Sequence, residues 1–505
     1  MQKNLIMALL LTSLIWIVWY TWIVPPQTQQ TKKVEISEVK KYDELKETKE
    51  LKTSQNTLVN NIKSFELKAS KTRFVLTSSL SIMELFYSGP VQEINLIPDS
   101  SKPFLSFYDL VKYREKLKKQ DEVSVSGKSD VEITKKLVIS NENELNRLIV
   151  ELKNTSPKTI KIPESELTVG PGLNTVKSEE NENPKIWKAL YAYNKKERKN
   201  PVIEKLKSDY KGEFIWAGIE NRYFIFAVLN DNKIFSAIKY SQQKINDNLA
   251  PMIRLVVEPF IINAGESKRF EVKFYAGPKD YDLLKKIGYG LHLSIDFGVF
   301  APLAKIANSL LKRFYAITKN YGVSIILLSI LVQIIMLPLT FKSYRAMAIM
   351  KKMQPEMRSI QERYKNDPKR MNMELMNLYR RYGANPFSGC WPMLLQIPIF
   401  FALFTTLRNS WNLHGARFIL WIKDLSDKDP YFVLPILMGA LMFLQNYLTP
   451  QTTQDASQAL VMKWMPIVFT FLFLTFPSGL VIYWIVNSLF SITLNYYLKQ
   501  KGFYS

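Results

Sequence analysis

The stretch SIILLSILVQIIMLPLTF, residues Ser324 to Phe341, decides the fold class of this chain. Nearly every residue in it is apolar, and a helix of this length, at about 1.5 Å of rise per residue, can cross a bilayer. Its middle nevertheless carries Gln333, a primary amide that finds no water to bond in hydrocarbon. Polar groups are tolerated at such depth where they line a water-filled cavity. The stretch therefore predicts a membrane-spanning helix with a hydrated place beside it.

The composition extends this prediction to the whole chain. Of its 505 residues 47% are hydrophobic, and the apolar ones gather near the N-terminus and in the last third, which is typical of a membrane protein with a large soluble insert. The net charge of +23 favours basic cytoplasmic loops and a lysine-rich domain over specific nucleic-acid binding. Cys390, His292 and His414 are the chain's only cysteine and histidines. We therefore expect no disulfide, metal site, cofactor or enzymatic activity, and no GxxxxGK[ST] run is present to bind a nucleotide.

The first 290 residues divide into three predicted parts. Residues 1–27 are expected to be a transmembrane anchor rather than a cleaved signal peptide, because tryptophan and tyrosine, not small residues, crowd the end of the apolar run. Residues 28–71 are polar and predict a tether. Residues 72–290 carry strand patterns, as in KRFEVKFYAG, where apolar and charged side chains alternate. An antiparallel β-sandwich is the architecture that this pattern favours.

The last third predicts a surface helix followed by five spans. Residues 297–320 have apolar side chains at three- and four-residue steps, opposed by lysines and Asn308, so we expect an amphipathic helix at the membrane surface. The predicted spans are residues 323–341, 390–407, 431–448, 464–476 and 479–498. The last two are separated because FPSG, residues 476–479, marks a turn. With the anchor this makes six spans, one of which is only about 20 Å long in a hydrocarbon core of roughly 30 Å.

Charge in the loops sets the predicted orientation. Residues 342–387 hold eleven basic and four acidic side chains, a net charge of +7, whereas residues 409–430 hold three of each sign. Basic loops stay in the cytoplasm. We therefore expect residues 342–387 and both termini to be cytoplasmic, and the β-domain to lie on the other side of the membrane.

Polar residues within the spans fall mainly in the cytoplasmic half of the predicted bilayer. The set comprises Ser329, Gln333, Gln396, Gln445, Asn446, Asn487, Ser491 and Asn495. For any one of them, an interhelical hydrogen bond worth about 0.6–2 kcal/mol is a sufficient explanation. The common depth of the whole set favours a hydrophilic groove that opens to the cytoplasm and is closed by apolar packing on the outer side.

The basic loop predicts two helices around the turn at Asn366–Pro368. It carries seven methionines: Met347, Met350, Met353, Met357, Met371, Met373 and Met376. Such a hairpin could simply pack against itself. Flexible thioethers beside many lysines and arginines favour instead a surface that meets varied apolar segments near anionic lipid headgroups.

Four stretches of the last third resemble the YidC/Oxa-type membrane protein insertases in their order and spacing. They are MLPLTFKSYRAMAIMKKMQPE, NPFSGCWPMLLQIPIFFALF, LWIKDLSDKDPYFVLPILMGALMFLQ and MPIVFTFLFLTFPSGLVIYWIVNSL, and the match covers residues 297–498. The anchor and β-domain look like the Gram-negative bacterial form. The resemblance implies an insertase of the bacterial inner membrane with a periplasmic β-domain. Its expected partners are nascent membrane proteins, the Sec translocon, the ribosome and anionic lipids.

The resemblance also implies roles for individual residues. Ser329 and Gln396 would line the groove together with Gln333, Asn446, Asn487 and Ser491. A substrate helix would slide past Phe400, Met438, Leu472 and Trp484. The hairpin around Met350–Met376 would capture substrates. The family usually places an arginine where this chain has Gln333, so attraction of acidic substrate segments by a fixed charge is not expected here. A solute transporter is the alternative function, although the chain shows no inverted repeat and no buried carboxylate for ion coupling.

Overall fold

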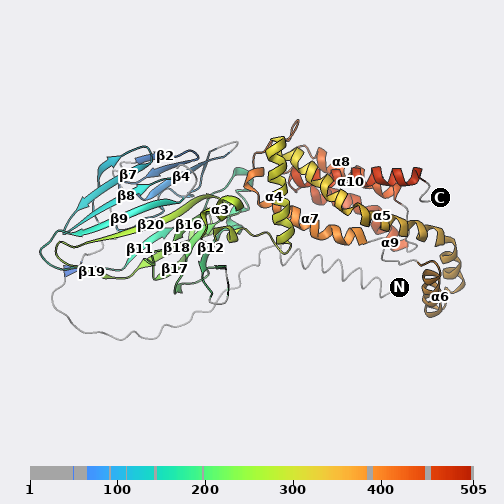
Figure 1. Cartoon of the computed structure of the whole chain (residues 1–505), viewed down its shortest axis with the longest axis horizontal. Coiled ribbons are helices and arrows are strands. Elements are labelled where there is room, and N and C mark those ends of the chain that lie inside the picture. Colours follow the sequence, from blue (N-terminus) through green and yellow to red (C-terminus); the bar gives the residue numbers. More distant parts are fainter. Residues whose placement is uncertain are drawn as a thin grey trace. The chain divides into compact units, whose positions relative to one another are not determined.

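The computed structural model describes residues 49–50, 65–89, 93–109, 111–140, 145–195, 198, 200–383, 391–449 and 456–501. The predicted anchor, residues 1–27, and most of the predicted tether lie outside these residues, as does Cys390. The chain divides into two compact units, Met1–His292 and Leu293–Ser505. The first is built of strands and the second of helices (Figure 1).

A nine-stranded sheet forms the main layer of the first unit. Its neighbours pair antiparallel throughout, which confirms the predicted antiparallel sheet. In spatial order the strands are β13 (Val202–Lys205), β12 (Lys188–Tyr193), β15 (Trp216–Glu220), β16 (Phe224–Leu229), β20 (Ser267–Pro278), β9 (Asn146–Asn154), β8 (Val131–Val138), β7 (Glu122–Lys128) and β6 (Arg114–Lys118).

Smaller sheets complete the sandwich. One four-stranded sheet has the order β2 (Phe65–Lys68), β3 (Thr72–Leu76), β4 (Ile82–Ser88) and β5 (Glu93–Asn95). A second has the order β11 (Ser165–Val169), β18 (Asn248–Val257), β17 (Ala237–Ile245) and β14 (Tyr210–Lys211). A third sheet joins β1 (Lys49–Glu50), β10 (Ile160–Ile162) and β19 (Phe260–Ile262), with β1 parallel to β10.

Aromatic contacts show how the layers meet. The ring of Tyr87 in β4 lies 5.8 Å from that of Phe224 in β16, in an edge-to-face arrangement. On the opposite face of the large sheet, the indole N–H of Trp216 donates to the carbonyl of Tyr289 at 3.1 Å, just after helix α3 (Tyr281–Ile287). Both faces of the central strands are therefore covered, and every residue of β15 and β16 is buried.

Strand β20 confirms the alternation that predicted it. Phe270, Val272 and Phe274 are buried in the sandwich, whereas Glu271 and Lys273 between them are half-exposed. A strand packed on one face gives this period of two. The short helix α2 (Asn183–Ile186) lies in the connection that precedes β12.

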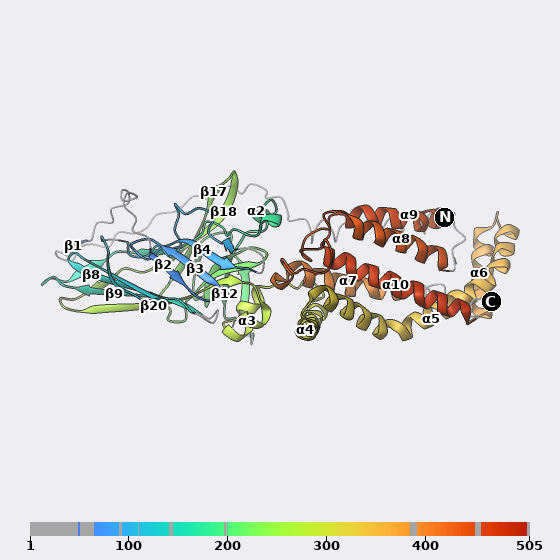
Figure 2. The same cartoon turned by 90° about the horizontal axis from the view of Figure 1, so that it is seen from above.

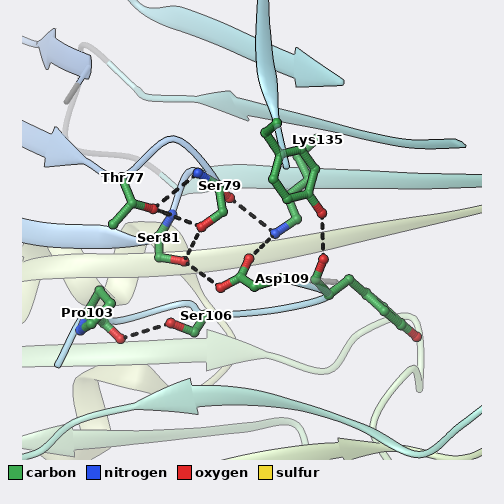
Figure 3. A network of polar contacts seen from close by, with 9 residues as sticks. Thr77, Ser79, Ser81, Pro103, Ser106, Asp109 and Lys135 are labelled. Atoms are coloured by element: carbon green, nitrogen blue, oxygen red, sulfur yellow. Dashed lines mark hydrogen bonds and ion pairs between the residues drawn. The ribbon is translucent and has the colours of Figure 1, made fainter. Parts of the chain in front are cut away.

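A buried lysine ties two loops of the first unit to β8 (Figure 3). The ammonium of Lys135 donates to Asp109 Oδ1 at 2.5 Å and to the carbonyl of Ser79 at 3.1 Å. Ser81 Oγ donates to the other oxygen of Asp109 at 3.2 Å. Burial lowers the pKa of Lys135, and the charge of Asp109 opposes that shift. This ion pair is a satisfied structural link between sheet and loops.

The second unit consists of seven helices within the described residues. They are α4 (Ala301–Thr318), α5 (Tyr321–Arg363), α6 (Pro368–Arg381), α7 (Trp391–Asn409), α8 (Val433–Leu448), α9 (Ala456–Phe473) and α10 (Ser478–Gln500). Helix α10 contacts α5, α7 and α8, and α8 contacts α9. Helices α5, α7, α8, α9 and α10 run alongside one another in both views (Figures 1 and 2).

Two of these helices are long and apolar enough to cross a membrane, Tyr321–Arg363 and Ser478–Gln500. Three shorter apolar segments accompany them: Leu394–Asn409, Val433–Leu448 and Lys463–Phe473. Apart from Cys390, five of the six predicted spans fall in the part of the chain that is described, and two of these five are full-length spans by this measure. The prediction rests on apolar runs in the sequence. Three of those runs, residues 390–407, 431–448 and 464–476, are shorter than about 20 residues, the usual length of a span.

Helix α4 turns three of its large apolar side chains outward, although Leu311 is buried. Leu303, Ile306 and Ile317 are exposed, whereas the small side of the helix, including Ala304 and Asn308, packs toward α5 and α7. The predicted opposition of an apolar and a polar face is therefore incomplete, because Asn308 is buried. An outward apolar face is consistent with a helix that meets lipid.

Candidate functional site

Amide and hydroxyl groups join α5 to α10 at two levels. The Gln333 side chain donates from Nε2 to Asn487 Oδ1. Farther along both helices, the hydroxyls of Tyr344 and Ser491 lie 3.2 Å apart. Near the helix starts, Ile325 of α5 faces Gly479 of α10. The order of these contacts shows that α5 and α10 run parallel, with polar groups meeting along their shared seam.

Helix α10 also bonds to α7 and α8. Gln396 of α7 donates from Nε2 to the hydroxyl of Tyr483. Asn495, near the end of α10, donates to Thr449 Oγ1 at 3.3 Å, just beyond α8. All the side chains that make these contacts are neutral. We call the set the polar seam: Gln333, Tyr344, Gln396, Thr449, Tyr483, Asn487, Ser491 and Asn495.

The structure brings together four of the six residues that the sequence assigns to a groove. Gln333, Gln396, Asn487 and Ser491 all belong to the polar seam. Ser329 is fully buried, and its hydroxyl donates back to the carbonyl of Ile325 in its own helix at 2.6 Å. Asn446 is half-buried on α8. Ser329 thus contributes little polarity to a neighbouring helix in this conformation.

Sequence reasoning missed three members of the polar seam, Tyr344, Tyr483 and Thr449. Tyr483 lies one helical turn before Asn487, so the stripe formed by Asn487, Ser491 and Asn495 extends outward by a further step of four residues. A search for polar atoms at that spacing would have found its hydroxyl. Tyrosine in an apolar run reads instead as an ordinary bulky side chain.

An aromatic cluster lies beside the polar seam, where α7, α9 and α10 meet. The ring of Trp484 lies 5.5 Å from Phe400, 5.3 Å from Phe473 and 5.5 Å from Phe469. Two of the residues predicted to contact a substrate helix, Phe400 and Trp484, are therefore neighbours. Leu472 of α9 is exposed.

Met438 does not fit its predicted role. Its side chain is fully buried in α8, so a passing helix cannot contact it in this conformation. At the adjacent Gly439, α8 approaches α9 so closely that a Cβ would lie 2.0 Å from Thr470 Oγ1. Sequence position alone does not reveal which face of a uniformly apolar helix is covered.

The hairpin of α5 and α6 divides its methionines between core and surface. Met353 and Met357 are buried with Leu378 in the core of the hairpin, and Met350 is buried as well. Met371 is half-buried, whereas Met373 and Met376 are each 56% exposed. The hairpin therefore packs against itself and also presents thioethers, and a role for these thioethers in binding apolar segments stays a prediction. The break between its helices falls at residues 364–367, as the turn at Asn366–Pro368 predicts.

The loop between α7 and α8, residues 410–432, supports the ends of two helices. The carbonyls of Asp427 and Leu425 accept from the N–H groups of Ser478 and Gly479 at the start of α10, at 2.7 and 3.0 Å. The buried carboxylate of Asp429 accepts from the backbone N–H of Leu434 at 2.7 Å, in the first turn of α8. The loop thus fixes how these helices begin.

His414 is the titratable centre of this loop. Its Nδ1 lies 3.3 Å from Asp424 Oδ2 and 3.2 Å from Ser426 Oγ, and its ring stacks on Trp411. Burial lowers the pKa of the imidazole, and the charges of Asp424 and Asp427 oppose that shift. Among the described residues no group of three or more His, Cys, Asp or Glu side chains could hold a metal ion.

Two protein-family models match the chain, one mainly in the first unit and one in the second. The model described as the YidC periplasmic domain matches residues 47–308. The model described as the 60Kd inner membrane protein matches residues 313–503. Together they cover most of the part of the chain that the structure describes.

Curated relatives carry the same description. The chain is 37% identical over 423 residues to the membrane protein insertase YidC of Endomicrobium trichonymphae, an alignment that covers 81% of this chain and 79% of the relative. It is 45% identical over 288 residues to the membrane protein insertase YidC of Syntrophus aciditrophicus, covering 57% of this chain and 52% of that relative. Among solved structures, a crystal structure of an active YidC insertase matches with a TM-score of 0.41 at 19% identity, covering 87% of this chain and 93% of that one.

Proposed function

The chain belongs to the YidC family of membrane protein insertases, and we propose that it integrates newly made membrane proteins through a hydrophilic groove along the polar seam. The groove opens to the cytoplasm and ends partway through the bilayer. The hydrogen bond between Gln333, in the middle of the apolar stretch Ser324–Phe341, and Asn487 carries this proposal. The relatives give no support to the transporter alternative.

Each amide of that pair keeps further hydrogen-bonding capacity. A primary amide has two N–H donors and a carbonyl with two lone pairs, and the bond between Gln333 and Asn487 uses one donor and one acceptor. Water or the polar end of a substrate can bond to the remaining groups. A hydrated groove shortens the low-dielectric path that a polar segment must cross, and burial of the new apolar helix in lipid drives the step.

The topology that serves this function has six spans, counting the predicted N-terminal anchor. Both termini and residues 342–387 lie in the cytoplasm and the β-domain in the periplasm, which places the protein in the inner membrane of a Gram-negative bacterium. The charge difference between residues 342–387 and 409–430 supports this orientation. Helices α7, α8 and α9, of 19, 16 and 18 residues, reach across if the bilayer is thinner beside them.

A substrate helix leaves the groove along the aromatic cluster. Phe400 and Trp484 lie together there, and the exposed Leu472 lies on α9, which packs on α8. Flat aromatic faces and aliphatic side chains accept helices of many sequences, because such contacts need no fixed hydrogen-bond pattern. Before that step the hairpin captures the apolar segment through Met373 and Met376. The Sec translocon, the ribosome and anionic lipids are the partners that we propose for this stage.

Solvent labelling tests the groove in the full-length protein in vesicles. Single cysteines replace Gln333, Gln396 or Asn487 in a variant that lacks the native cysteine, and a charged maleimide is added from the cytoplasmic side. Ile335, an exposed apolar residue of the same α5 helix, provides the control. We expect the three seam positions to react and the Ile335 position to stay unreactive. Seam positions as unreactive as the control would rule out a hydrated groove.

Substitution of Gln333 tests what the amide does. Gln333→Leu should lower insertion, since the groove loses a polar group and Asn487 loses its partner. Gln333→Arg should favour substrates with acidic tails, because it adds the charge that this chain lacks. Insertion by Gln333→Leu equal to wild type, with no gain from Gln333→Arg, would show that the amide is not needed. A photocrosslinker at Phe400 should capture a stalled nascent chain, whereas one at the buried Met438 should not.

A further inference from the structure

A tight turn in the loop between α7 and α8 presents two aliphatic side chains. The backbone N–H of Phe418 donates to the carbonyl of Ile422 at 3.0 Å, and the N–H of Ile422 donates to the carbonyl of Ile419 at 3.1 Å. Between them, Ile419 is 55% exposed and Leu420 82% exposed. We call residues 418–422 the apolar tip.

The base of the apolar tip is held firmly on both sides. The ring of Phe418 presses on Gly322 at the start of α5, where a Cβ would lie 2.0 Å from the ring. The carbonyl of Phe418 accepts from Asn320 Nδ2 at 3.4 Å. On the other side, Trp421 Nε1 donates to the buried Asp429 at 3.0 Å, and Ile422 is buried. The exposure of Ile419 and Leu420 is therefore a fixed feature of the fold.

The backbone of the tip supports the same interpretation. Leu420 has a φ of 52°, in the left-handed region that a leucine rarely adopts. Such conformations persist only where the surrounding structure imposes them, and they gather at positions that have a task. Here the imposed conformation turns a large aliphatic side chain away from the protein, which is unfavourable in water.

The surroundings of the tip indicate the chemistry of its partner. Arg417 and Lys423, which flank it in sequence, are exposed. Tyr431, whose ring lies 6.4 Å from that of Trp421, is exposed as well. Aliphatic side chains bordered by cations and by amphipathic aromatic rings are the composition of a membrane interface, where phosphate groups lie just outside the hydrocarbon.

We propose that the apolar tip inserts into the lipid leaflet on its side of the membrane, with Arg417 and Lys423 bound to lipid phosphates. The loop would then be held at a fixed depth, and it would hold α8 and α10 through their first turns. Lipid is favoured over a protein partner because α5 and α10, whose first residues the loop contacts, are the helices long enough to span the bilayer. The inference uses the membrane location of the family and does not depend on the hydrated groove.

Depth-dependent quenching tests this inference in the full-length protein in nanodiscs of phosphatidylethanolamine and phosphatidylglycerol. An environment-sensitive fluorophore is attached to Leu420→Cys, or to Ile419→Cys as a second probe, in the variant without the native cysteine. Lys428→Cys, in the same loop but outside the tip, is the matched control. We expect both tip probes to be quenched several-fold more by nitroxide-labelled lipid than by iodide, and the Lys428 probe to show the reverse.

Two outcomes would overturn the proposal. Quenching of the tip probes by iodide to the extent seen at Lys428 would place the tip in water. Protection from both quenchers would show that protein, from this chain or another copy, covers it. Nanodiscs that each hold one protein distinguish a contact within the chain from a contact with another copy, because only the contact within the chain can form there. Labelling of Gln333→Cys in the same samples reports the groove separately, so that either proposal can fail alone.

Discussion

Gln333 and Asn487 illustrate how a neutral pair can replace a charge inside a membrane. On scales derived from membrane insertion, a charged side chain at the bilayer centre costs about 2.5–3.5 kcal/mol. A hydrogen bond between amides of two helices instead stabilises the fold by about 0.6–2 kcal/mol. The pair therefore stabilises the contact between α5 and α10 while it keeps polar atoms at depth. A single substitution at either position leaves the other amide without this partner.

The sequence identifies such residues by depth but does not pair them. Gln333, Gln396 and Asn487 stand out because amides are rare in apolar helices, and the structure places all three in the polar seam. Which amide meets which hydroxyl depends on how the helices are rotated against each other. How each helix is rotated about its axis depends on how its side chains pack. At Gly439, for example, the lack of a side chain lets α8 approach α9. Met438 is fully buried on the same helix, which its position in a uniformly apolar run does not indicate.

His414 gives a pH dependence to the start of α10. Its pKa is lowered in the folded loop, so the opened loop takes up a proton first as the pH falls below the usual histidine value of about 6.5. Stability of the closed loop is thus fully present above that pH and is lost as the pH decreases toward the folded pKa. We expect faster opening in this acidic window, by at most about tenfold per pH unit.

Hydrogen exchange measures that opening at the amides of Ser478 and Gly479, which donate to carbonyls of the loop. The exchange rates are corrected for the intrinsic effect of pH. His414→Phe is the control, because its ring can still stack on Trp411 and does not titrate. An equal acid response in wild type and His414→Phe would show that His414 does not cause the effect.

At the scale of elements, the crossing of α8 and α9 depends on a glycine. Gly439→Ala would place its Cβ against Thr470 Oγ1, whose hydroxyl donates to the carbonyl of Pro466 at 2.7 Å. We expect the free energy of unfolding to fall by about 1–3 kcal/mol, the usual effect of overpacking. Equilibrium unfolding of wild type and Gly439→Ala in mixed micelles measures this difference in free energy.

Thr470→Ala supplies the matched rescue. It removes Oγ1 and Cγ2, two of the three atoms nearest the added Cβ, so the double variant should recover part of the stability lost by Gly439→Ala. Additive losses in the double variant would show that the two side chains do not meet. Insertion activity in the same variants tells whether the close crossing also matters for substrate passage.

The hairpin permits a comparison within one residue type. Met353→Ala removes a core side chain packed near Leu378 and should destabilise the hairpin by about 2–5 kcal/mol. Met373→Ala alters an exposed side chain and should leave stability unchanged within about 0.5 kcal/mol. If Met373 helps to capture substrates, its variant should lose crosslinking to an apolar nascent segment. Unchanged crosslinking, with the hairpin still folded, would remove the exposed methionines from the capture step.

Element boundaries were predictable where a local signal marks them. Pro368 begins α6, and the FPSG segment separates α9 from α10, because proline and glycine interrupt the helical hydrogen-bond ladder. The join between membrane span and hairpin had no such signal. Helix α5 continues through both as 43 residues, since nothing in SYRAMAIM stops a helix. The exposed apolar face of α4 was visible in the periodicity, whereas the burial of Asn308 depends on neighbours from other helices.

The whole molecule consists of two units with separate cores, and the boundary between them lies at His292. A cut near Tyr240 falls inside β17. Removal of the chain before this cut leaves β18 paired only with residues 241–245 of β17, and it leaves β20 without β9 and β16. Unpaired strands with apolar faces associate with other chains. Periodicity locates strands but does not say which distant strands share a sheet.

Deletion of residues 65–292 tests whether insertion belongs to the helical unit alone. The polar seam, the aromatic cluster and the hairpin all lie after Leu293, so we expect this variant to retain much of its insertion activity in proteoliposomes. The matched deletion of residues 65–240 removes fewer residues yet should perform worse, because it leaves β18 and β20 exposed and prone to aggregate. If the first deletion leaves a folded helical unit that no longer inserts substrates, the β-domain has a direct part in the reaction. If the two variants are equally active, the strands that remain after the shorter deletion do not cause aggregation.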